Sequence, residues 1–205
     1  MKHLLISAFL VLGAACAGAP PLVVPPDWAP NAPVGAVAPY RVGNALCSSV
    51  AISSTLALTA AHCMDEAGRL GTVQSVDRAE AREVVWTEWF EDWGRGQDIA
   101  VLEVNAEHPF AEWADTSTAV PNPGDPLTIV GYCPTASARV RPARAGILWQ
   151  GEYVFFGEIC GGDSGGGLFN AAGELIGANV RTNGDGIGVA TPVAAAAPLL
   201  ERFDD

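Results

Sequence analysis

The stretch ICGGDSGGGLF, residues 159–169, places five glycines around one aspartate and one serine and then continues into a short apolar segment. Glycines permit backbone conformations that other residues avoid, and they let a ligand approach the main chain closely. The amides of Gly162 and Ser164 can therefore point together and hold a negative charge, as in an oxyanion hole. Considered alone, the stretch is equally compatible with a flexible turn or an anion-binding loop, so Ser164 is a candidate nucleophile that needs partners elsewhere.

Short apolar runs recur along the chain after its N-terminal part, and most of them span about 4 to 8 residues. They are rich in Val, Ile, Thr and aromatic residues and are bounded by Gly, Pro, Asn or Asp, a pattern typical of a β-sandwich or β-barrel. They occupy residues 49–61, 83–90, 98–104, 127–132, 145–149, 152–156, 166–170, 174–180 and 187–193. We therefore predict an all-β fold with closed barrels and one short C-terminal helix over residues 194–203.

The first 17 residues have the features of an export signal: Lys2, the apolar run LLISAFLVLGAA, and small residues around Cys16. The run is too short to span a bilayer, which takes about 20 residues. We expect an extracytoplasmic protein, secreted or periplasmic. Two outcomes stay open at Cys16: a lipid anchor attached to this cysteine, or cleavage after Ala17 that discards it.

The next segment, residues 18–40, is rich in proline and predicts an extended linker, although its later half is also compatible with a first strand. We assign residues 41–205 to the folded domain, which we expect to be monomeric. The net charge of −12 argues against a nucleic-acid partner, because phosphate binding needs clustered cations. Lys2 is the only lysine, so the chain also lacks a polybasic membrane-binding segment.

Export would place Cys47, Cys63, Cys133 and Cys160 in an oxidising compartment, where two disulfides are the expected state. With these cysteines committed and few histidines left, we expect no metal site and no cofactor. Calcium on the acidic pair at positions 91 and 92 stays open as an alternative.

Acyl transfer by a serine requires a base and a carboxylate that orients the base. His62 ends an apolar run where a strand meets a loop, whereas His108 lies in a polar turn before Pro109. Asp98 directly precedes a buried-looking strand, where a carboxylate can hold an imidazole tautomer. Each has an ordinary alternative: His62 as a packed histidine beside a disulfide, and Asp98 as a turn residue that begins a strand.

Three motifs, LTAAHC, DIAVLEV and GGDSGGGLF, resemble in content and order those of the chymotrypsin-like (trypsin-fold) serine peptidases. The resemblance implies two six-stranded antiparallel β-barrels, with the triad His62, Asp98 and Ser164 in the cleft between them. It also implies disulfides Cys47–Cys63 and Cys133–Cys160. Residues 173–193 are most similar to the HtrA/Deg branch, in which the corresponding strand pair lines the substrate channel.

The chain departs from the digestive enzymes of this family because no activation sequence stands at the usual distance before Cys47. In those enzymes a freed N-terminus pairs with the aspartate before the nucleophile, here Asp163. We therefore predict a domain that is competent without that cleavage.

The resemblance assigns Glu158 to the base of the primary specificity pocket, where a carboxylate would favour Arg or Lys in the substrate. The alternative is a rim residue turned to solvent. Val180, Arg181 and Thr182 are expected to line the same pocket, and Arg181 could neutralise Glu158.

These observations predict an exported serine endopeptidase that cleaves protein or peptide substrates through an acyl-enzyme. A catalytically inactive trypsin-fold binding module is the alternative from another class. We expect the tryptophans at positions 86, 89 and 93 to pack in the core of the first barrel rather than to form a binding surface.

Overall fold

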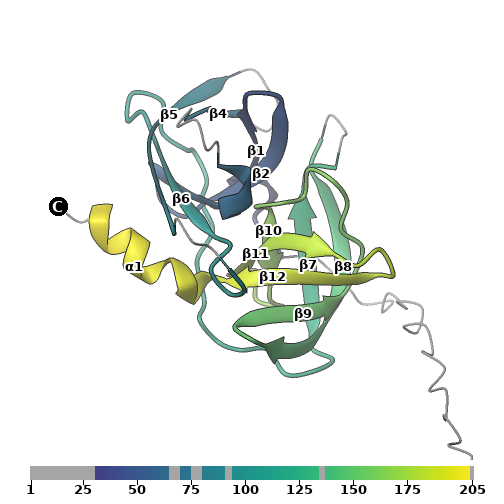
Figure 1. The fold of residues 1–205 in the computed structure, drawn as a ribbon. Helices are drawn as coiled ribbons and strands as arrows, with labels where there is room; N and C mark the ends of the chain where they lie inside the picture. Colours follow the sequence, from purple (N-terminus) through teal and green to yellow (C-terminus); the bar gives the residue numbers. More distant parts are fainter. Residues whose placement is uncertain (1–30, 65–69, 75–79, 91–93, 134–136, 204–205) are drawn as a thin grey trace, which may run out of the picture.

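The computed structural model describes residues 31–64, 70–74, 80–90, 94–133 and 137–203, and these form two closed six-stranded β-barrels (Figure 1). Every pairing between neighbouring strands is antiparallel. The all-β prediction and the two barrels implied by the sequence motifs are both confirmed. Within the described residues, no helix has the length and apolar character needed to cross a membrane.

The first barrel closes in the order β1-β2-β3-β6-β5-β4. Its strands are β1 (Val37–Val42), β2 (Ala45–Ala51), β3 (Leu56–Thr59), β4 (Thr72–Gln74), β5 (Ala81–Trp89) and β6 (Ala100–Val104). A 3-10 turn, η1 (Val34–Ala36), precedes β1, and η2 (Ala61–Cys63) follows β3. The later half of the proline-rich segment thus supplies the first strand, because β1 begins at Val37.

The second barrel closes in the order β10-β11-β12-β9-β8-β7. Its strands are β7 (Pro126–Gly131), β8 (Arg139–Trp149), β9 (Glu152–Phe156), β10 (Gly167–Phe169), β11 (Leu175–Thr182) and β12 (Ile187–Pro192). The C-terminal segment is helical, as expected, but only α1 (Ala197–Leu200) is α-helix, with η3 (Val193–Ala196) and η4 (Glu201–Phe203) as 3-10 turns on either side.

Each barrel has its own hydrophobic core, and a further hydrophobic cluster contains residues of both barrels. Val50 and Ile99 of the first barrel pack in the same buried cluster as Val130 and Phe169 of the second. Burying such side chains contributes about 1.5 to 3 kcal/mol each relative to leaving them in water. The shared cluster therefore fixes one barrel against the other, and it fixes the loops that end near this junction.

The tryptophans of β5 do not pack as the sequence indicated. Trp86 is 55% exposed and donates a hydrogen bond to Glu88, so its prediction as a core residue was wrong. Trp89 is partly buried, and the tryptophan at position 93 lies outside the described residues, as do the acidic pair at 91 and 92 and Cys16. The β5 register shifts between Val84 and Trp86 opposite β6, and such a bulge changes the face to which the following side chains point.

Candidate active site

His62 and Asp98 meet at one end of the first barrel. His62 lies in the η2 turn directly after β3, and Asp98 lies two residues before β6, the strand that pairs with β3. The Asp98 Oδ2 atom is 2.8 Å from His62 Nδ1, and Oδ1 accepts a 2.9 Å hydrogen bond from the His62 amide. The carboxylate is thus bound at both oxygens to the same residue. It can orient the imidazole and stabilise it when it becomes protonated.

Asp98 is more buried than His62, as this chemistry requires. The Asp98 side chain is 7% exposed, whereas the His62 side chain is 30% exposed. A shielded carboxylate interacts strongly with its partner, because water does not compete for it. The His62 side chain keeps this partial exposure to solvent, from which a reacting group can approach it.

The loop with Ser164 belongs to the second barrel but is held by the first. Ser48 of β2 donates its amide to the Ser164 carbonyl at 2.7 Å and its hydroxyl to the Gly162 carbonyl at 2.7 Å. The same hydroxyl accepts the Tyr132 amide at 2.9 Å. Cys63, the neighbour of His62, places its Sγ 3.9 Å from the Ser164 carbonyl oxygen. Ser164 therefore lies beside the turn that contains His62.

Two glycines of this loop are required by their backbone conformation and their surroundings. Gly162 has φ +94°, and a Cβ there would lie 2.2 Å from the Tyr132 carbonyl oxygen. Gly165 has φ +80°, and a Cβ there would lie 2.2 Å from the Ser48 carbonyl oxygen. Residues with a side chain would be strained in both places. The loop is therefore packed tightly against its neighbours at Gly162 and Gly165, which argues against the flexible-turn interpretation.

A buried ion pair lies beneath the loop and was not predicted from the sequence. Asp163 is fully buried, and its Oδ2 lies 2.7 Å from Arg141 Nη2 of β8. The same oxygen accepts the Cys160 amide at 2.8 Å. A buried carboxylate needs such partners, because an unpaired buried charge is strongly destabilising. Arg141 thus supplies a cation to Asp163 from within the chain.

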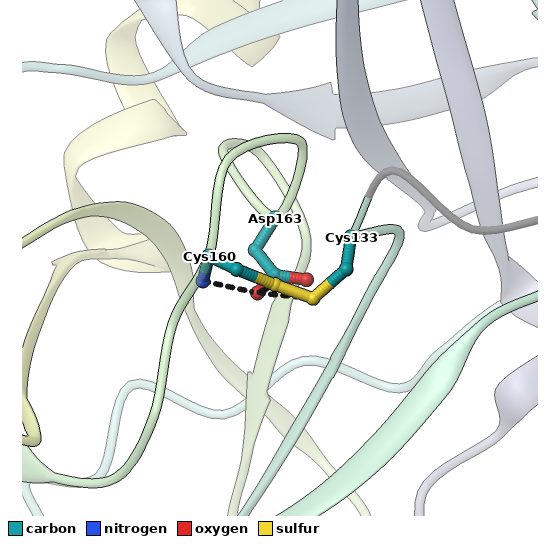
Figure 2. Close-up of side chains that lie close together, drawn as sticks. All are labelled: Cys133, Cys160 and Asp163. Carbon is teal, nitrogen blue, oxygen red and sulfur yellow. Dashed lines mark hydrogen bonds between the residues drawn. A yellow bond between two sulfur atoms is a disulfide. The ribbon is translucent and has the colours of Figure 1, made fainter.

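Both disulfides have the expected pairing. Cys47 is bonded to Cys63, which ties β2 to the turn that contains His62. Cys133 is bonded to Cys160 and ties the end of β7 to the loop that contains Ser164. Figure 2 shows this second disulfide lying against the Asp163 carboxylate. Cys133, Cys160 and Asp163 are residue types that bind metal ions. The two cysteine sulfurs are joined in the disulfide, however, and Arg141 already neutralises the carboxylate, so the three residues do not fit a metal ion.

The residues expected to form the specificity pocket are not arranged as a charge pair. Glu158 is exposed, and Arg181 is bonded to Glu152 rather than to Glu158. The possibility that Arg181 neutralises Glu158 is therefore not realised in the structure, where Arg181 neutralises Glu152 instead. Val180 is buried, whereas Thr182 is exposed and donates its hydroxyl to the Ile187 carbonyl across the β11–β12 hairpin.

Arg181 keeps its charge firmly. Its pKa is raised, first by the hydrogen bond to Glu152, against a partial opposing effect of burial, and further by the negative charges of Glu152 and Asp98. The influence of Asp98 indicates that this guanidinium lies in the electrostatic environment of the His62–Asp98 pair.

Comparisons with known proteins agree with this geometry. Residues 47–177, more than half of the chain, match the family described as the trypsin-like peptidase domain. No curated protein matches the chain in sequence.

Solved structures show the same fold. The Rv3671c protease of M. tuberculosis, in an inactive form, is 20% identical with a TM-score of 0.67, covering 82% of this chain and 89% of that one. A serine endoprotease from Yersinia pestis is 24% identical with a TM-score of 0.70, over 82% of this chain but only 62% of that one. Mouse neuropsin, a serine protease, is 16% identical with a TM-score of 0.68, covering 84% and 96%.

A double barrel of this topology, the His62–Asp98 pair and the family match over residues 47–177 all agree, and the chain therefore belongs to the trypsin-like peptidase family.

Proposed function

We propose that the chain is an exported serine endopeptidase that hydrolyses peptide bonds through Ser164, His62 and Asp98. The observation that supports it most directly is the 2.8 Å contact between Asp98 and His62 Nδ1, beside the loop that contains Ser164. When Nδ1 of His62 carries the imidazole proton and donates it to Asp98, Nε2 is unprotonated. Nε2 can then accept the proton of a serine hydroxyl.

In the proposed reaction, the Ser164 hydroxyl attacks the scissile carbonyl carbon while His62 takes its proton. The amides of Gly162 and Ser164 donate to the oxyanion of the tetrahedral intermediate. His62 then returns the proton to the leaving amine, and the acyl group stays on Ser164. A water molecule then attacks this ester while His62 takes its proton. His62 passes that proton to the Ser164 oxygen as the acyl–oxygen bond breaks, which releases the second product and the free enzyme.

The structure supports competence without an activating cleavage. The Asp163 carboxylate lies against Arg141 and the Cys133–Cys160 disulfide, as Figure 2 shows for the disulfide. Because that cation is part of β8, the loop does not depend on a newly freed N-terminus. One chain also contains all the residues of the proposed triad, so the proposal requires no second copy.

Labelling with an active-site fluorophosphonate tests the proposal. The mature wild-type protein should form one adduct, located on Ser164 by peptide mass spectrometry, and Ser164→Ala should form none. Absence of an adduct on the folded wild-type protein, or equal labelling of both proteins, would overturn it. That result would favour the binding-module alternative.

Export is part of the proposal, and the mature N-terminus tests it. Mass spectrometry of the protein from its producing cell distinguishes a chain that begins at Gly18 from one that begins at a lipid-modified Cys16. An intact Met1 terminus on the active protein would contradict export through this segment.

A further inference from the structure

The turn between β8 and β9 lies between two parts of the candidate site. On one side its Gly151 packs against Gly96, where a Cβ would lie 3.0 Å from the Gly151 carbonyl oxygen. Gly96 stands two positions before Asp98. On the other side Glu152, the first residue of β9, is bonded to Arg181 of β11. The turn therefore joins the loop that leads into Asp98 to strand β11.

Arg95 reaches this turn from the Asp98 side. Its guanidinium lies over the Trp149 ring, 4.7 Å from the ring centroid, and donates a hydrogen bond to Gln150 Oε1. The side chains of Arg95 and Trp149 are both open to solvent, and that of Trp149 is 47% exposed. A guanidinium stacked on an aromatic face keeps its in-plane N–H groups directed outward and available.

Arg181 reaches the same turn from the other side. Both of its terminal nitrogens bond to the two Glu152 oxygens, one of them at 2.7 Å. Glu152 is 1% exposed, whereas the Arg181 side chain is 45% exposed. The buried carboxylate therefore acts as a fixed support that holds the guanidinium in one orientation at the surface. Arginine has N–H donors beyond those that Glu152 accepts.

The position of Arg181 along β11 places it close to the nucleophile. Asn179 exchanges backbone hydrogen bonds with Gly165 and Gly166, the residues directly after Ser164, at 2.7 and 2.8 Å. Arg181 is two residues further along the same strand. When the scissile carbonyl of a bound peptide lies at Ser164, residues a few positions away along that peptide are within reach of the end of β11.

Two exposed arginines, one bonded to Gln150 and the other to Glu152 at the same β8–β9 turn, stand out in a chain with a net charge of −12 and a single lysine, Lys2. Glu152 is the only carboxylate to which either of them is bonded among the described residues. We propose that Arg95, Trp149 and Arg181 form a subsite that binds a carboxylate side chain of the substrate. The enzyme then prefers substrates with Glu or Asp within a few residues of the scissile bond. This inference rests on the proposed peptidase function and adds a substrate class to it.

Cleavage profiling of the mature protein with a peptide library tests the subsite. Glu and Asp should be enriched at one position near the cut. A pair of peptides that differ only by Glu or Gln at that position then gives the ratio of their kcat/KM values, expected to be about fivefold in favour of Glu and smaller at 1 M salt.

Substitutions then attribute this ratio to the two arginines. Arg95→Gln and Arg181→Gln should each reduce the ratio, and the double variant should bring it near one. Because Arg181→Gln leaves the buried Glu152 without a cation, a variant with both Arg181→Gln and Glu152→Gln restores a neutral hydrogen-bonded pair. Arg202→Gln is the matched control, since Arg202 is likewise an exposed arginine bonded to a glutamate, Glu88. It should leave the ratio unchanged.

The outcomes separate this inference from the proposed function. Equal kcat/KM values for the Glu and Gln peptides at every position, with cleavage intact, would overturn the subsite and leave the peptidase. A preference that survives the double arginine variant would also overturn it. No cleavage of any peptide, together with no fluorophosphonate adduct, would overturn both.

Discussion

Arg141 lies with Nη2 2.7 Å from the carboxylate of Asp163, the residue next to the candidate nucleophile, and both side chains are buried. The pair links β8, a strand wholly within the second barrel, to the loop between Cys160 and Ser164. The orientation of that loop therefore depends on a charge that is present as soon as the barrel has folded.

Replacing Arg141 by Met should destabilise the protein strongly. The fully buried Asp163 carboxylate would lose its cation, and breaking a buried pair in this way costs about 3 to 5 kcal/mol of unfolding free energy. Denaturant titration measures the loss, and the rate of fluorophosphonate labelling should fall as well. Arg139→Met, at an exposed position of the same strand, is the control and should change stability by less than about 1 kcal/mol. Equal losses in the two variants would contradict a special role for Arg141.

Asp98→Asn should lower kcat by about 10³- to 10⁴-fold, because an amide favours the wrong imidazole tautomer while keeping the shape of the carboxylate. Steady-state kinetics on a cleaved peptide measures the effect, and a thermal unfolding curve checks that the fold is kept. Asp115→Asn serves as the control because Asp115 is exposed and accepts the Leu175 amide only through its main-chain carbonyl. A loss below about tenfold in Asp98→Asn would argue against its role as the orienting carboxylate.

Ser48→Ala should reduce kcat while changing KM little. The substitution removes the hydroxyl that bridges the Gly162 carbonyl and the Tyr132 amide, and it leaves that buried amide unsatisfied at a cost of about 1 to 3 kcal/mol. We expect kcat to fall by at least about tenfold, which is less than the roughly 10²- to 10³-fold fall that follows removal of an oxyanion donor itself. The adjacent Ser49 is equally buried and donates its hydroxyl to the Ala38 carbonyl, away from the Ser164 loop, so Ser49→Ala is the matched control. Similar kinetics for both variants would refute the bridging role.

Removing the second disulfide by Cys133→Ala and Cys160→Ala together should lower the unfolding free energy by about 3.5 kcal/mol, from the chain-entropy relation for this loop. The two cysteines are 27 positions apart, compared with 16 for Cys47 and Cys63. The corresponding Cys47 and Cys63 double variant should lose about 3 kcal/mol on the same basis. Denaturant titration under non-reducing conditions compares the two, and an undiminished value for the first would show that this bridge does not constrain the unfolded chain.

The sequence was most informative where the information is local. The motifs around His62, Asp98 and Ser164 each occupy a few consecutive residues, and the short apolar runs follow the period of buried strands. Fold class, both disulfides and the proximity of His62 to Asp98 could therefore be predicted.

Contacts between distant segments could not be predicted in the same way. The first half of β8, RVRPAR, is polar and contains Pro142, so it gave no strand signal, and its buried Arg141 went unnoticed. The missing activation sequence was a usable signal, because Asp163 then needs another cation. The sequence could not show which glutamate pairs with Arg181, because Glu152 and Glu158 are equally plausible along the chain, and only the β11–β12–β9 strand order selects Glu152.

The hydrogen bonds from Ser48 to the Gly162 and Ser164 carbonyls connect the two barrels, so they are lost if the chain is cut between the barrels. A chain cut between the barrels yields two fragments, each with a nearly complete sheet, yet the fragment that contains the serine lacks the donors that shape its loop. Neither half alone then holds the His62–Asp98 pair beside the Ser164 loop. The complete candidate site forms only when the two halves of the chain have come together.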